Sequence, residues 1–191
     1  MYRFILTLLA LSITLGMSAS TVYAGSSVAH PSWPRSLRDD LTERVRLSRI
    51  EVQDLSDQGS VILKGTVLRL QADGIPANQL RSVQLNPKSP RRFHVADYAR
   101  LEIGRDGRIT ADPGAVSLTK GTELVVLDLK VSGDQVRLFT HTLDPVPLPG
   151  GKVGHGCTEF VFAFDPGTLN RANLGAIAGR IDEVLTRNSN G

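Results

Sequence analysis

Two strand-like segments joined by a tight turn restrict the fold of this chain more than any other feature. Residues 123–131 (ELVVLDLKV) predict a strand, with Asp128 and Lys130 on one face. This strand would place four apolar side chains on the other face: Val125, Leu127, Leu129 and Val131. Ser132-Gly133-Asp134 has the residue types of a hairpin turn, and residues 135–141 return. The pair predicts an antiparallel hairpin and therefore a β-rich fold.

Much of the remaining chain shows the same pattern of short strands and turns. Further strands are expected over residues 49–55, 61–71, 92–95, 99–103, 108–110 and 158–164. Gly65 predicts a bulge or bend inside the second of these strands, and the last would send Phe160, Phe162 and Phe164 into the core together. Prolines predict a long surface loop over residues 75–90 and a second loop over residues 143–154.

Helical periodicity is confined to two segments. Residues 36–46 begin with a capping pattern, in which Ser36 precedes Asp39. Asn170 can cap a second helix that runs to about Arg187 and buries one apolar stripe. The predicted fold is α+β: a small, mostly antiparallel curled sheet, or an SH3-like or OB-like barrel, with the C-terminal helix packed on it. A flat sheet with one covering helix is the alternative.

Residues 1–24 have the composition of an export signal. They contain one cation, Arg3, then an apolar run, and they end in the small-residue site Val22-Tyr23-Ala24. Removal of this signal would leave a flexible lead over residues 25–35, one β-rich domain over residues 36–187 with its helix at 170–187, and a tail over residues 188–191. The expected location is periplasmic or secreted.

Composition bears on three further properties. The net charge is +3, with the cations dispersed, which gives no basis for nucleic-acid binding. No apolar run after the signal is long enough to cross a bilayer. Cys157 is the single cysteine, so an internal disulfide cannot form.

The residues with the clearest chemical potential lie around that cysteine. A thiolate nucleophile needs a nearby base and N–H donors for the oxyanion, and Gly154-His155-Gly156-Cys157 offers an imidazole and flexible glycines. In an extended chain His155 and Cys157 point to the same side, and His141 lies upstream as a second base. The alternative is that Cys157 is a small buried apolar residue at the start of a strand. The three residues could in principle ligate Zn²⁺, but no second Cys or His pair supports a metal site, so neither metal nor cofactor is predicted.

This segment resembles the active-site signature of the L,D-transpeptidases, in which His-Gly and a spacer precede Ser-His-Gly-Cys, an aliphatic residue and Arg. The resemblance covers residues 140–159 and implies Cys157 as the nucleophile, with His141 or His155 to orient and activate it. The chain departs from the signature at Thr142, Gly154, Thr158 and Glu159. The last departure inverts the charge at a position expected to help organise an anionic peptide substrate.

Several stretches also resemble a group of uncharacterised exported bacterial proteins. They are residues 64–71 (KGTVLRLQ), 73–75, 118–124 (LTKGTEL), 133–138 (GDQVRL) and 160–169 (FVFAFDPGTL). This resemblance implies a compact β-domain after a signal peptide, with no known reaction.

We therefore expect an exported, non-catalytic binding or scaffolding module of the bacterial cell envelope, whose partner is an envelope component or another protein. Its binding surface is expected beside residues 75–90. The alternative is a divergent cysteine acyl-transferase acting on cell-wall peptide through Cys157, His155 and His141.

Overall fold

The computed structural model describes residues 36–51, 60–83 and 93–187. Contacts divide the chain into two units, Met1–Trp33 and Pro34–Gly191, and all described residues belong to the second unit. The predicted signal, the lead and the tail therefore lie outside the described residues.

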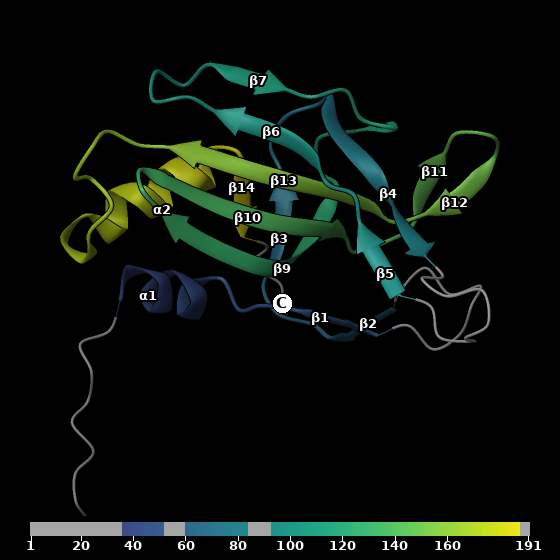
Figure 1. Cartoon of the computed structure of the whole chain (residues 1–191), viewed down its shortest axis with the longest axis horizontal. Helices are drawn as coiled ribbons and strands as arrows, with labels where there is room; N and C mark the ends of the chain where they lie inside the picture. Colours follow the sequence, from purple (N-terminus) through teal and green to yellow (C-terminus); the bar gives the residue numbers. More distant parts are fainter. Residues whose placement is uncertain (1–35, 52–59, 84–92, 188–191) are drawn as a thin grey trace, which may run out of the picture. The chain divides into compact units, whose positions relative to one another are not determined.

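A curled, half-barrel mixed sheet with helices packed on it forms the described unit, which confirms the predicted α+β class (Figure 1). The main sheet runs in the order β14 (Leu185–Arg187), β3 (Val67–Leu70), β9 (Glu123–Ser132), β10 (Gln135–Thr142), β13 (Gly156–Ala163), β4 (Ile75–Val83) and β5 (Phe93–Ala96). Branching from this path are β6 (Ala99–Ile103), β7 (Ile109–Ala111) and β8 (Val116–Leu118). Separate hairpins pair β1 (Arg49–Glu51) with β2 (Ser60–Leu63), and β11 (Val146–Leu148) with β12 (Lys152–Gly154).

The predicted β9–β10 hairpin is confirmed, and β13 extends it into the centre of the sheet. One edge of β13 pairs antiparallel with β10. The other edge is shared: its first residues pair with β4, and Thr158–Phe162 pair with β6 in parallel. Because two strands diverge along one edge, the sheet curls, and β14 and β3 lie behind β10 and β13 in the view of Figure 1.

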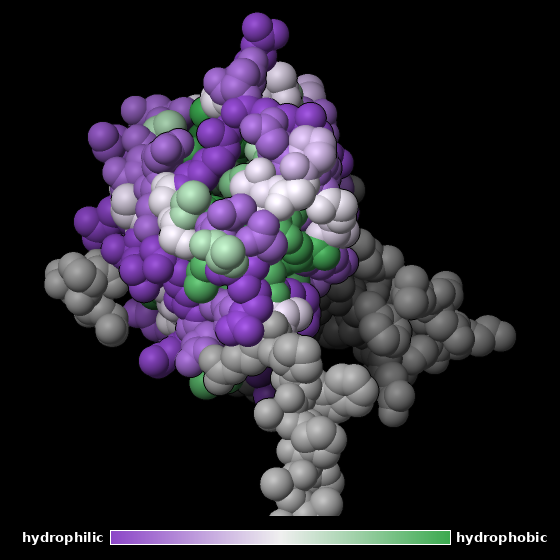
Figure 2. All heavy atoms as spheres, turned by 90° about the vertical axis from the view of Figure 1, so that its left-hand side faces the viewer, coloured by the Kyte–Doolittle hydropathy of each residue, from purple (hydrophilic) through white to green (hydrophobic). Residues whose placement is uncertain are grey.

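The core fills the concave side of this sheet. Phe160 and Phe162 from β13 are fully buried and Phe164 is nearly so, as the sequence predicts. The helices α1 (Leu37–Arg44) and α2 (Leu174–Asp182), the latter preceded by the short 3-10 helix η1 (Arg171–Asn173), also contribute to this core. The side of the unit that carries these helices is mostly hydrophilic, with hydrophobic side chains visible in a central hollow (Figure 2). No helix in the described ranges is long and apolar enough to cross a membrane.

The start of α1 has the capping geometry that its sequence predicts. The Ser36 hydroxyl accepts a hydrogen bond from the Asp39 N–H at 3.2 Å, and the Asp39 carboxylate accepts one from the Ser36 N–H at 2.9 Å. These two bonds satisfy donors that the first turn of a helix leaves unpaired.

The C-terminal helix is shorter than its periodicity predicts. It ends at Asp182 instead of near Arg187, and Leu185–Arg187 forms β14, which pairs with β3. Leu185 is fully buried in β14, and a longer helix would also bury it on its apolar stripe. Burial of Leu185 therefore does not decide between a helix and a strand. The strand prevails because β3 offers an unpaired edge whose backbone groups need partners.

The prediction of one long loop over residues 75–90 is wrong. Ile75–Val83 is the nine-residue strand β4, and residues 84–92 lie outside the described ranges. Pro76 fits in β4 because its carbonyl accepts a hydrogen bond from the Thr158 hydroxyl at 2.7 Å, and the N–H that proline lacks is not needed there. Part of the other predicted loop, residues 143–154, likewise forms the β11–β12 hairpin.

Two other sequence details change in the structure. The alternation in β9 is interrupted by a register shift near Phe139 and Thr140, so Leu124 and Val126 face the core in place of Val125 and Leu127. Gly65 separates β2 from β3 instead of bending one strand. Only glycine fits there, because a Cβ at this position would lie 2.0 Å from the Arg46 carbonyl oxygen.

Candidate functional site

The structure brings together the three residues that the sequence singles out. His141, near the end of β10, lies directly opposite Cys157 on β13. His155, just before β13, stacks on His141 with the ring centroids 4.3 Å apart. We call His141, His155 and Cys157 the imidazole–thiol cluster.

Both imidazole rings of the cluster form a hydrogen bond to the same backbone carbonyl, that of Thr142. The Nδ1 atoms of His141 and His155 lie 2.7 Å and 2.9 Å from the Thr142 carbonyl oxygen. Because that oxygen can only accept, each Nδ1 carries the proton in these bonds. The buried Nε2 of His141 has no hydrogen-bond partner among the described residues.

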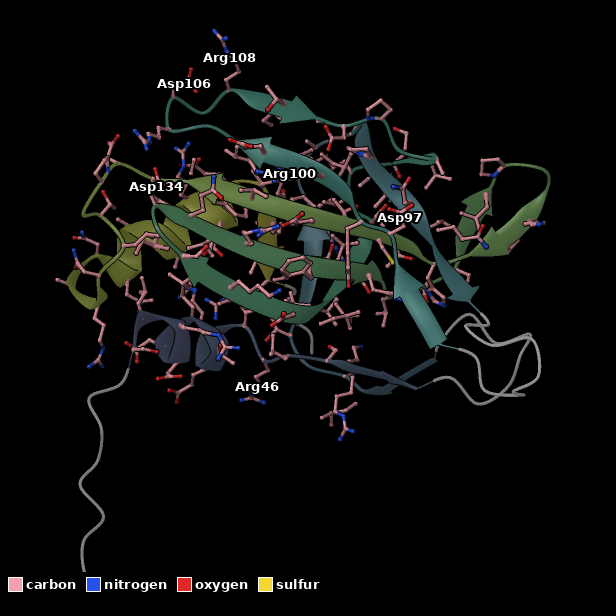
Figure 3. All side chains as sticks on the ribbon, viewed as in Figure 1. Arg46, Asp97, Arg100, Asp106, Arg108 and Asp134 are labelled. Carbon is pink, nitrogen blue, oxygen red and sulfur yellow. The ribbon has the colours of Figure 1, made fainter. Side chains whose placement is uncertain are left out.

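Burial sets the protonation states of the cluster. The Cys157 side chain is fully buried, and this burial, followed by the charge of Asp97, raises the pKa of its thiol to about 12. Asp97 follows β5 in the sequence (Figure 3). Burial, followed by the charge of His155, lowers the pKa of His141 to about 4, although the bond to Thr142 acts in the opposite direction. The cluster therefore holds a neutral thiol beside a neutral imidazole, whereas nucleophilic cysteines are held as thiolates beside imidazolium or other positive charge.

The glycine-rich lead to Cys157 has a packing role. The Gly156 N–H donates to the Thr142 hydroxyl at 3.0 Å, so it is already occupied and not free to bind an oxyanion. A Cβ at Gly156 would lie 3.0 Å from the Ala77 side chain, which explains the absence of a larger residue.

Glu159 also lies next to the cluster, two residues along β13 from Cys157. Its side chain is only 10% exposed and forms an ion pair with Arg137 on β10. Phe139 lies near this pair: the Arg137 guanidinium is 5.5 Å and the Lys130 ammonium 4.8 Å from its ring centroid. In the described part of the chain, no group of three or more His, Cys, Asp or Glu side chains is placed to hold a metal ion.

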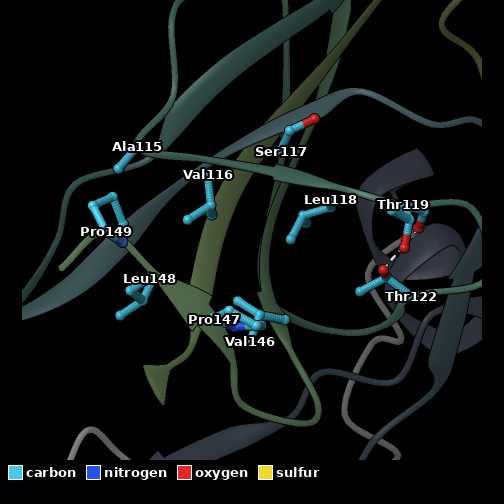
Figure 4. A pocket seen from close by; sticks show the side chains of 10 residues that line it. All are labelled: Ala115, Val116, Ser117, Leu118, Thr119, Thr122, Val146, Pro147, Leu148 and Pro149. Carbon is cyan, nitrogen blue, oxygen red and sulfur yellow. Dashed lines mark hydrogen bonds between the residues drawn. The ribbon is translucent and has the colours of Figure 1, made fainter. Parts of the chain in front are cut away.

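A more accessible site, which the sequence does not predict, lies beside β8. A cavity of about 430 Å³ is bounded on one side by Ala115–Thr119 and Thr122 and on the other by Val146–Pro149 of β11 and its turn (Figure 4). The side chains of Val116 and Leu118 point into it, and that of Ser117 points away. Its volume is in the range of ordinary ligand sites.

Two further hollows adjoin this first one. The second, of about 500 Å³, shares Ala115, Val116 and Ser117 with it and extends to Pro76 and Asp112. The third, of about 380 Å³, shares Thr122 and Val146 with it and contains Glu123 and Asp144. We call these three adjoining hollows the β8 groove. Sequence reasoning missed it because β8 is a three-residue strand and because β11 and its turn contain Pro147 and Pro149, which are typical of loops.

Comparison of the chain with protein-family models, with curated proteins and with solved structures finds no match. The two resemblances noted in the sequence therefore stay predictions.

Proposed function

We propose that this chain is an exported, non-catalytic binding module of the cell envelope, and that its β8 groove holds an extended segment of a partner protein. The observation that carries the proposal is the apolar first hollow, which lies between two strands, β8 and β11, that do not pair with each other. Residues 1–24, with the composition of an export signal, support the envelope location.

The groove has the features of a binding site for extended chains. It is extended, because three hollows share lining residues with one another. Its lining combines apolar side chains with the hydroxyl groups of Thr119 and Thr122. Small-molecule and peptide sites use this combination, in which apolar area supplies affinity and a few polar groups fix orientation.

A selection from a phage-displayed library of short random peptides, carried out on the purified chain, tests this proposal. Enriched peptides should bind the wild type and should lose at least about tenfold in affinity when Pro147, an exposed lining residue, is changed to Arg. The matched control is Leu63→Arg, which places the same charge on an exposed apolar position in β2 that lines none of the three hollows. Failure to enrich any peptide, or equal binding to the Pro147→Arg variant, would overturn the proposal.

The second candidate function is the divergent cysteine acyl-transferase. The observation that favours it is the register of His141 directly opposite Cys157, with His155 stacked on His141. An acyl-transferase requires a thiol that reacts with an electrophile in the folded protein. Labelling of Cys157 before and after unfolding separates the two candidates.

A further inference from the structure

We infer that the free edge of β8 accepts an added strand from a partner protein, in which apolar side chains alternate with lysine or arginine. The inference deepens the proposed function and rests on it. Three features support it: the backbone of β8, the hollows that border that strand and the charges that line them.

The backbone of Ser117 is available for an added strand. Within the described residues β8 pairs only with β4, and Ser117 lies opposite Pro76. Pro76 has no N–H, and its carbonyl is turned to β13, where it accepts the Thr158 hydroxyl at 2.7 Å. In an antiparallel ladder, residues of a pair that exchange no hydrogen bonds both direct their backbone groups outward. The N–H and C=O of Ser117 therefore point away from β4, to the free edge.

The hollows lie where the side chains of such a strand would go. The first and second hollows share Ala115, Val116 and Ser117, and so both border β8. Successive side chains of a strand point to opposite faces, so a strand added beside Ser117 would place alternate side chains in the first and the second hollow. Peptides that extend a sheet are recognised in this way, with main-chain bonds for affinity and alternate pockets for specificity.

The lining of each hollow indicates which side chain it accepts. The first hollow is lined by Val116, Leu118, Val146 and Leu148, which favour an apolar side chain. The second contains the Asp112 carboxylate, and the third contains Glu123 and Asp144. Among the described residues, no lysine, arginine or histidine lines any of the three hollows.

Two of these carboxylates have no cation partner among the described residues. Asp112 and Asp144 form no ion pair in the described part of the chain, whereas Glu123 pairs with Arg69 at 3.0 Å. Asp112 and Asp144 lie in different hollows on either side of the first. A partner strand with cations flanking an apolar residue would complement both, which favours a basic, alternating segment over a second copy of this chain.

Four short fluorescent peptides test the inference by anisotropy against the purified chain: alternating Lys-Val, alternating Glu-Val, neutral alternating Thr-Val, and a peptide with the Lys-Val composition in two blocks. The alternating Lys-Val peptide should bind at least about tenfold more tightly than the Glu-Val and block peptides, with an affinity that falls as salt rises.

The double variant Asp112→Asn, Asp144→Asn should lose most of that preference and keep its affinity for Thr-Val. The change Ser117→Pro should weaken all alternating peptides at least about tenfold, since it removes the edge N–H. Should that variant fail to fold, backbone N-methylation of the Lys-Val peptide must give the same loss.

The outcomes separate the inference from the proposed function. If Lys-Val and Glu-Val bind equally, or if the block and N-methylated peptides bind as well as the alternating one, the inference is overturned and groove binding stands. If no peptide, neutral Thr-Val included, binds saturably, both are overturned. A dimer seen by sedimentation that the Lys-Val peptide does not dissociate would mean that a second copy occupies the edge, which also overturns the inference.

Discussion

The imidazole–thiol cluster and the β8 groove differ in a way that residue type alone does not reveal. The cluster has the reactive side chains, but Cys157 and His141 are fully inaccessible, and burial keeps both of them uncharged. The groove is lined by side chains of low reactivity, such as Val116 and Pro147, but it is accessible and borders a strand edge. The comparison teaches that access and an unpaired strand edge, which support the proposed binding at the groove, occur in this fold apart from the residues with nucleophile chemistry.

The largest effect expected from this comparison concerns the reactivity of Cys157. Raising the thiol pKa from 9.0 to about 12 lowers the thiolate fraction about a thousandfold at pH 8. Labelling with a thiol reagent should therefore be at least about a thousandfold slower in the folded chain than in the same chain in denaturant. Since Cys157 is the single cysteine, the signal needs no correction. Equal rates would contradict the buried cluster and restore the acyl-transferase.

A second effect is acid destabilisation by His141. Its pKa falls from 6.5 to about 4 on folding, so between these values the unfolded chain binds a proton that the folded chain does not. Above pH 6.5 the side chain contributes nothing to the pH dependence. As the pH falls from 6.5 to 4, the free energy of unfolding should fall by about 3 kcal/mol, and below pH 4 this contribution should level off.

The measurement is urea unfolding across that pH range in the wild type and in His141→Gln. The variant removes the ionisable ring, so its stability should fall less steeply than that of the wild type, whatever its stability at neutral pH. Parallel curves would show that His141 is not held neutral by burial.

A smaller effect tests whether the groove wall is held as rigidly as the cluster. A Cβ at Gly114, just before β8, would lie 2.7 Å from the Ala77 nitrogen and 2.8 Å from the Pro76 Cβ. Gly114→Ala should therefore displace β8 from β4 and cost about 1–3 kcal/mol in unfolding free energy. The matched control is Gly179→Ala in α2, where a Cβ meets nothing within 4 Å and should stabilise the helix by about 0.5–1 kcal/mol. A neutral Gly114→Ala would mean that the groove wall adjusts freely.

The smallest effect on stability is expected at the acidic end of the groove. Asp144 is exposed and forms no ion pair within the described residues, so Asp144→Asn should change the unfolding free energy by less than about 0.5 kcal/mol. Thermal or urea unfolding checks this value. A loss of more than about 1 kcal/mol would show that Asp144 supports the fold and would weaken its assignment to partner binding.

The sequence predicts the elements that depend on local patterns. The β9–β10 hairpin, the Ser36 cap of α1 and the burial of the phenylalanines in β13 follow from alternation, turn residues and capping pairs. It does not predict the elements that depend on distant partners. The sequence around Leu185 is compatible with a helix or a strand, and the pairing with β3 decides for the strand. Pro76 argues against a strand in the sequence, but in the structure the Thr158 hydroxyl donates a hydrogen bond to its carbonyl.

The two candidate sites show the same difference between features that depend on local patterns and features that depend on distant partners. The sequence could predict that His141, His155 and Cys157 lie close together, because His155 and Cys157 are two residues apart and His141 lies one hairpin upstream. It could not predict that Cys157 and His141 are buried, because burial depends on how the sheet curls. The β8 groove joins segments about thirty residues apart, Ala115–Thr119 and Val146–Pro149, and no local pattern predicts that they face each other.

The pairing of β14 with β3 has a consequence for the order in which this fold can form. β14 is the last described strand, and it pairs with β3, which lies much earlier in the sequence. β13 pairs with three strands, β10, β4 and β6. Contacts of such long sequence separation form slowly, and β14 can pair with β3 only after residues 185–187 have left the ribosome. A truncation before Leu185 would leave β3 with an unprotected edge that invites aggregation.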